Sequence, residues 1–168
     1  MPRGVRKLAL TAHVTVSVGW LGAVAGFLAL AVTGVTSDDG QKVRSAYLLM
    51  ELMGWFVLLP LALASFVTGL LQALGTEWGL FRHYWVLFKL LINVFATIVL
   101  LLYMQTLHHL ADLAAGSGPE GDVDVLRSAS PLVHALLALV LLLVATALAV
   151  YKPRGFTPYG LSKRGRRT

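Results

Sequence analysis

The sequence has 168 residues, of which 57% are hydrophobic and only 13% are charged, with a formal net charge of +6. Soluble domains carry roughly 25% charged residues, so this chain lacks the polar surface that a water-soluble domain of its size needs. The composition also excludes a disordered chain and a coiled coil. The absence of cysteine excludes disulfides and thiolate metal sites. The expected solvent is therefore a lipid bilayer.

Four apolar segments carry the excess of hydrophobic residues. Each is long enough to cross a bilayer, which takes about 20 residues in a helix. Because backbone polar groups in lipid must be satisfied internally, we predict an all-α polytopic membrane protein, an antiparallel bundle of four transmembrane helices. The predicted helices are residues 8–35, 46–74, 84–110 and 132–151, in one domain (1–151) that a basic tail follows (152–168).

The distribution of lysine and arginine predicts the orientation. Ten of them lie in the N-terminal segment, the second loop and the tail, against three in the first and third loops. The positive-inside rule therefore places both termini in the cytoplasm, in a bacterial cytoplasmic membrane. The first segment is longer than the roughly 7–15 apolar residues of a secretory signal, so we expect it to be retained. The basic tail is expected to lie against anionic lipid and not to bind nucleic acid.

Polar side chains recur along one face of the third helix. Lys89, Asn93 and Thr97 follow one another at steps of four residues, and Met104 and His108 are assigned to the same face. Since ionisable residues are costly in lipid, we expect this face to point into the bundle. The alternative is that Lys89 extends to the cytoplasmic interface and His108 lies among the outer head groups.

The first helix brings a histidine to the depth of Lys89. His13 lies about one turn inside the cytoplasmic end, and Trp20 lies on the same side of the helix. On another side Gly22 and Gly26 form a GxxxG pair, which permits close packing of another helix. We therefore predict an inner polar pocket formed by His13, Trp20, Lys89 and Asn93.

A second polar group is expected at the outer end, where the second and fourth helices begin and the third helix ends. Two histidines on separate helices of a bundle can hold haem iron axially. We predict a b-type haem with His108 and His134 as axial ligands, and with His109 and Met104 as further members of the site. Arg127 is placed to meet the propionates. Such a protein would be a membrane oxidoreductase that exchanges electrons with quinone or another membrane carrier.

Copper is the alternative cofactor, because thioether groups add a preference for Cu(I) to the imidazoles. In a third interpretation the polar groups only connect helices, and the protein is an accessory membrane subunit without a cofactor. A pore would require several copies, so a homo-oligomer is a further partner to consider. The copper ligands would be Met50, Glu51, Met53, Met104, His108 and His134 outside, with His13 inside.

Short motifs in the first three helices match known membrane families. The first helix reads H-x6-W-x-G from His13, the second contains Pro60 and then Thr-Gly at 68–69, and the third opens with YWVLFK at 84–89. Over residues 8–110 the sequence resembles the small bacterial membrane proteins related to copper-resistance protein D. It also resembles, more distantly, the HemJ-type membrane protoporphyrinogen oxidase.

The resemblance implies a cofactor and three functional positions. The oxidase-type relatives imply four helices and a b-type haem, and the copper-resistance relatives imply copper uptake. By match, His13, Trp20 and Lys89 would be functional. Residues 31–36 (AVTGVT) depart from the oxidase pattern, so the resemblance does not extend to protoporphyrinogen oxidation.

Overall fold

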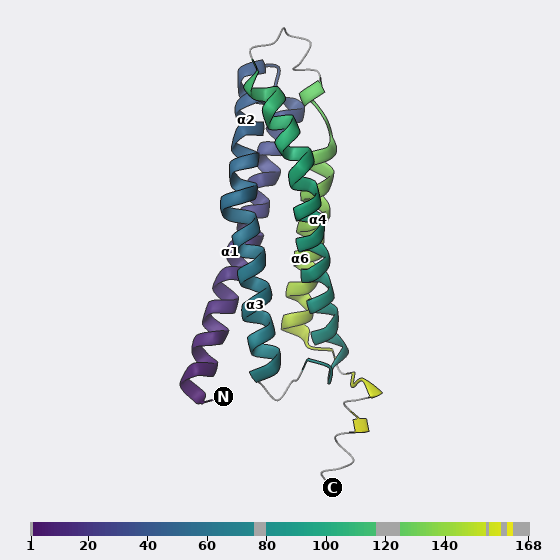
Figure 1. The fold of residues 1–168 in the computed structure, drawn as a ribbon. Coiled ribbons are helices and arrows are strands. Elements are labelled where there is room, and N and C mark those ends of the chain that lie inside the picture. The colour runs from purple at the N-terminus through teal and green to yellow at the C-terminus, as the bar shows by residue number, and fades with distance from the viewer. Residues whose placement is uncertain (1, 76–79, 117–124, 154, 159–160, 163–168) are drawn as a thin grey trace.

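The computed structural model describes residues 2–75, 80–116, 125–153, 155–158 and 161–162. The elements are α1 (Arg3–Thr36), α2 (Gly40–Met53), the π-helical turn η1 (Gly54–Leu58), α3 (Leu59–Gly75), α4 (Tyr84–Ala115) and α6 (Ser130–Tyr151). Because α2, η1 and α3 form one continuous helix, the described residues contain four helices that are long and apolar enough to cross a membrane (Figure 1). The predicted all-α, four-helix membrane fold is confirmed.

Each observed helix extends the predicted one at one or both ends. Hydropathy marks the part of a helix that lies in hydrocarbon, whereas backbone pairing continues into the polar flanks. At the start of α2, the Asp39 side chain accepts hydrogen bonds from the backbone N–H groups of Gln41 and Lys42 and caps the helix. In the first turn of α6, Pro131 occupies a position where no N–H is needed.

The π-helical turn η1 was not predicted from the sequence. The N–H of Leu59 bonds to the carbonyl of Gly54, five residues back. The next residue, Pro60, has no N–H and interrupts the regular ladder, so the π turn lies where the helix must adjust. A Cβ on Gly54 would lie 2.5 Å from Met104 Sδ, so the lack of a side chain lets α4 pack directly on this turn.

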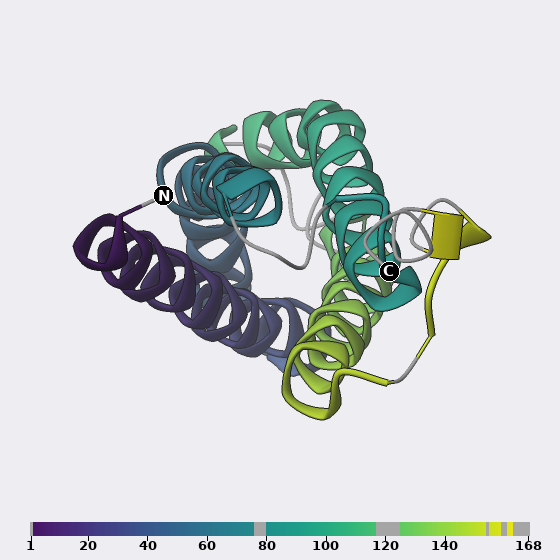
Figure 2. The same cartoon turned by 90° about the horizontal axis from the view of Figure 1, so that it is seen from below.

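The four spans form a ring when viewed along the bundle axis (Figure 2). Both α1 and α4 pack against α2, α3 and α6, so α1 and α4 occupy opposite corners. The first turn of α1 and the last turn of α6 lie at one end of the bundle, here called the terminal end (Figure 1). The other is the loop end. That the terminal end faces the cytoplasm stays a prediction.

The loop half of the bundle is tightly packed. The Tyr47 hydroxyl donates to the backbone carbonyl of Leu126, which fixes α2 against the segment before α6. Of the predicted glycine pair, Gly26 faces α2, and a Cβ there would lie 3.5 Å from Met53 Cε. A Cβ on Gly22 would meet nothing within 4 Å, so this glycine makes no close helix contact in the bundle. The largest fully buried side chains all lie in this half: Tyr47, Met50, Met104, Leu107, Leu126, Val43 and Pro131.

Candidate functional site

A cavity of about 710 Å³ lies in the terminal half of the bundle, between α1, α3, α4 and α6. Cavities of roughly 300–1,000 Å³ with apolar walls and a few polar groups are typical of small-molecule and cofactor sites. The apolar part of the wall includes Leu21, Phe66 and Leu142. The cavity also brings together all four residues of the predicted inner pocket, His13, Trp20, Lys89 and Asn93.

Two residues of α3 hold the His13 imidazole. The Thr68 hydroxyl donates to the carbonyl of Ala64 at 2.7 Å, so its oxygen accepts the Nδ1–H of His13 at 3.0 Å. In the neutral ring this leaves Nε2 with a free lone pair, as in metal-binding histidines. A Cβ on Gly69 would lie 3.1 Å from His13 Cε1, so glycine leaves room for the ring. The Thr-Gly motif noted in the sequence therefore positions the histidine, a role that sequence reasoning did not assign.

A hydrogen-bonded row lies deeper in the cavity. The hydroxyls of Ser17 and Ser65 are 3.1 Å apart, and Asn93 Nδ2 donates to Ser65 Oγ at 3.2 Å. Asn93 Oδ1 is buried and has no hydrogen-bond partner in the described part of the chain. One turn further, Thr97 donates to the backbone carbonyl of Asn93 at 2.8 Å. Polar groups thus extend from the His13 level into the middle of the bundle.

Basic side chains line the part of the cavity that is nearest to the terminal end. Lys89 is half-buried, and its Nζ lies 5.8 Å from the centroid of the Trp85 ring, within the range of a cation–π contact. Arg6 and Lys152 line the same cavity. Among the residues that the structure describes, no carboxylate forms an ion pair with Lys89. The cavity therefore has basic side chains near the terminal end, a row of hydroxyl and amide groups deeper inside, and apolar side chains over the rest of its wall.

The segment after α6 covers one side of the terminal end. The Thr157 backbone N–H bonds to the Arg82 carbonyl at 3.1 Å, and its hydroxyl donates to the carbonyl of Phe81. The rings of His83 and Phe156 lie 4.8 Å apart. Sequence reasoning missed this contact, because isolated backbone pairing leaves no periodic signal. The third-loop residues 117–124 and most of the basic tail (154, 159–160 and 163–168) lie outside the described residues.

His108 lies at the surface of the loop half and does not point into the bundle as expected. Its side chain is 62% exposed, with Nδ1 2.6 Å from Glu51 Oε1 and Nε2 3.5 Å from Asp112 Oδ2. Both ring nitrogens thus face carboxylates. The steps of four and seven residues from Lys89 to His108 accumulate a rotation of about 100° on a helix of about 3.6 residues per turn. The two residues therefore lie on different faces of α4.

The second predicted axial ligand has a separate environment. The His134 ring stacks on Tyr103 with centroids 3.9 Å apart, and its Nδ1–H donates to the Ser130 carbonyl at 2.9 Å. The neighbour of His108, His109, is exposed. Neither His108 nor His134 lines the 710 Å³ cavity. The structure therefore does not present the predicted axial pair to one haem-sized space.

The predicted copper ligands are divided between the core and the surface. Met50 and Met104 are buried in the hydrophobic core and Met53 packs against it, whereas His108 is exposed. In the described ranges, no three histidine, aspartate or glutamate side chains are grouped so as to hold a metal ion. Arg127, expected to meet haem propionates, donates to the Ser37 carbonyl at 3.2 Å. At the loop end the predicted ligands therefore pack in the core or pair locally, and a cofactor there stays a prediction.

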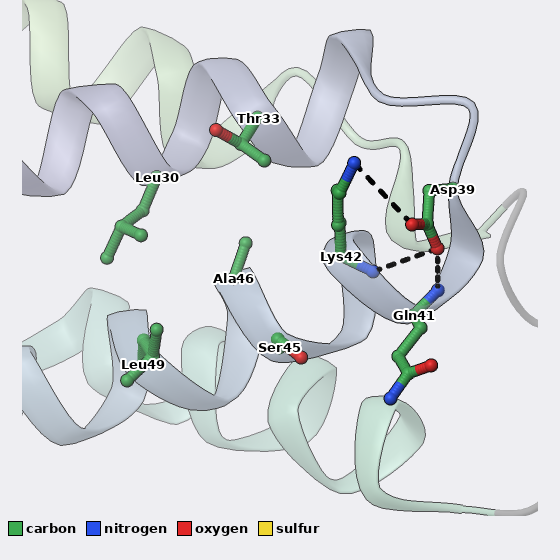
Figure 3. A pocket seen from close by; sticks show the side chains of 8 residues that line it. All are labelled: Leu30, Thr33, Asp39, Gln41, Lys42, Ser45, Ala46 and Leu49. Atoms are coloured by element: carbon green, nitrogen blue, oxygen red, sulfur yellow. Dashed lines mark hydrogen bonds and ion pairs between the residues drawn. The ribbon is translucent and has the colours of Figure 1, made fainter.

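A smaller cavity of about 400 Å³ lies at the loop end between α1 and α2 (Figure 3). Asp39 is its main polar contact point: Asp39 Oδ1 accepts the N–H groups of Gln41 and Lys42, and Asp39 Oδ2 lies 3.6 Å from Lys42 Nζ. These contacts cap α2. The cavity is lined by Leu30, Thr33, Asp39, Gln41, Lys42, Ser45, Ala46 and Leu49.

Comparisons with models of protein families, with curated proteins and with solved structures found no match to this chain. The resemblance to copper-resistance protein D and to the HemJ-type oxidase therefore stays a prediction. The chain is a multi-pass membrane protein with four helices able to span the bilayer.

Proposed function

We propose that this membrane protein binds an amphipathic redox molecule in the cavity of its terminal half, with b-type haem as the first candidate. The observation that supports this proposal is the cavity of about 710 Å³, which combines an apolar wall with polar groups in one part. An amphipathic ligand suits such a cavity, because its apolar body can lie along the apolar wall while its head group contacts the polar side chains.

The residues of the cavity fit haem b. The imidazole of His13 has the Nε2 lone pair that an axial iron ligand needs, since its Nδ1–H is bound to Thr68. Lys89 and Arg6 are cations suited to the propionates. Bound haem supplies one-electron chemistry, which the protein would tune through its ligand and surroundings. His13 would then hold the haem iron, in place of the His108 and His134 pair expected from the sequence.

A lipid quinone is the second candidate. The hydroxyl and amide groups of Ser17, Ser65 and Asn93 all line the cavity, and such groups can donate hydrogen bonds to the carbonyls of a neutral ring. A quinone would place its head at this level and its apolar tail along the wall. The two candidates differ in charge, which allows them to be separated.

The experiment uses the purified full chain in lipid nanodiscs, titrated with haem b and, separately, with a short-chain quinone. Haem is followed by its Soret band and by the reduced-minus-oxidised spectrum, and quinone by quenching of tryptophan fluorescence. We expect saturable binding of at least one probe. If the probe is haem, His13→Ala should lower its affinity at least about tenfold, because the iron loses a ligand.

His134→Ala is the matched control, since it removes an imidazole from the other half of the bundle. It should leave haem binding unchanged. Loss of the Soret band in His134→Ala but not in His13→Ala would instead support the axial pair expected from the sequence. If neither haem nor quinone binds saturably above empty nanodiscs, the proposed function is wrong.

A further inference from the structure

Basic side chains line the cavity, and no carboxylate that the structure describes forms an ion pair with Lys89. Lys89 and Lys152 both line this cavity, as does the neutral imidazole of His13. Arg6 lines the same cavity. All carboxylates that the structure describes lie in the loop half, at Asp38, Asp39, Glu51 and Asp112.

A half-buried lysine within a membrane-spanning helix is costly. Ionisable side chains within membrane spans are normally paired with one another or line a functional site. In the described part of the chain Lys89 has only the Trp85 ring as a charge-stabilising neighbour, and a ring contact is weaker than an ion pair. The arrangement is therefore one that an anion entering the cavity would stabilise.

We infer that the ligand of this cavity is a dianionic amphiphile, a molecule with an apolar body and a head group that carries at least two negative charges. This inference rests on the proposed function and narrows it. The head group lies against Lys89 and Arg6, in the part of the cavity nearest to the terminal end. The apolar body extends from there toward Trp20. Two carboxylates or one diphosphate meet this requirement, whereas a neutral quinone does not.

Two matched pairs of probes test the charge requirement. The first pair is haem b and its dimethyl ester, in which both propionates are neutral. The second pair is farnesyl diphosphate and farnesol. Each is titrated into the full chain in nanodiscs of neutral phosphatidylcholine, with empty nanodiscs as the background. We expect the charged member of at least one pair to bind about tenfold or more tightly than its neutral partner.

Substitution at Lys89 shows whether this cavity is the site that discriminates between charged and neutral probes. Lys89→Met keeps an unbranched side chain that is one atom shorter and removes its charge, and it should abolish most of the preference for the charged probe. Lys42→Met is the control, because Lys42 is an exposed lysine of the loop end that pairs with Asp39. It should preserve the preference. Without ligand, Lys89→Met should raise the thermal midpoint, since it removes a half-buried charge that pairs with no described carboxylate.

The outcomes separate this inference from the proposed function. A preference in the haem pair alone supports a dianionic redox ligand with carboxylate head groups. A preference in the prenyl pair alone supports a dianionic ligand with a phosphate head group, and it contradicts the redox part of the proposed function, because a prenyl diphosphate is not a redox molecule. If neutral and charged probes bind equally, or if Lys89→Met retains the full preference, the inference is wrong while a binding cavity still stands. If none of these probes binds saturably, the inference is wrong, and the proposed function stands only if the short-chain quinone binds.

Discussion

In the loop half of the bundle charged side chains pair with one another, whereas in the terminal half basic side chains line a cavity. Glu51 meets His108 at 2.6 Å, and the Tyr47 hydroxyl reaches a backbone carbonyl. In the terminal half, Lys89 and Arg6 line the large cavity, and no described carboxylate pairs with Lys89. A group of ionisable residues in a membrane sequence therefore indicates a site only where the fold leaves those residues without internal partners.

The largest expected effect concerns which half faces the cytoplasm. The excess of lysine and arginine in the N-terminal segment, the second loop and the tail predicts that the terminal half does. A reporter fused after Thr168 that is active only in the cytoplasm should therefore give full activity. A second fusion, with a reporter active only in the periplasm, should be silent. The opposite result would place the cavity on the outer side of the membrane.

The tight packing of the loop half predicts that it does not tolerate an added methyl group. In Gly54→Ala the new Cβ would lie 2.5 Å from Met104 Sδ and 2.8 Å from its Cε, and Met104 is only 1% exposed. Overpacking of this kind costs about 1–3 kcal/mol. We expect a clear fall in the thermal midpoint of the purified protein in detergent.

Gly22→Ala is the matched control, because a Cβ there meets nothing within 4 Å. It should leave the midpoint unchanged or raise it slightly, since alanine favours a helix over glycine. Equal midpoints for the two variants would show that the contact of α4 with the π turn is looser than the structure indicates.

A glycine-to-alanine substitution in the terminal half, at Gly69, should affect ligand binding more than stability. In Gly69→Ala the new Cβ would lie 3.1 Å from His13 Cε1, so the imidazole must shift by a few tenths of an ångström. Because residues that orient a metal ligand typically contribute about 10–100-fold in affinity, haem should bind about tenfold more weakly. The thermal midpoint should change little, as the ring can move toward the cavity. Unchanged haem affinity would mean that His13 is not the ligand.

The sequence is sufficient to predict the four spans, because a bilayer imposes length and apolarity on every helix that crosses it. It also places His13 and Lys89 together, since both lie within a few turns of helix ends on the same side of the membrane. It is not sufficient to place His108, because a small error in helical rotation accumulates over five turns. The π turn and the contact at Thr157 depend on tertiary packing, which leaves no periodic pattern.

The smallest expected effect is at the pair of Glu51 and His108, which the sequence placed at the centre of a site. Their side chains are 25% and 62% exposed, so solvent competes for the contact, and exposed ion pairs contribute little to stability. Glu51→Gln and His108→Ala should therefore leave the thermal midpoint and ligand binding close to those of the parent protein. A double-mutant cycle measures the coupling between them. Loss of binding in either variant, with the midpoint retained, would mean that the loop half takes part in function and that the contrast between the two halves is wrong.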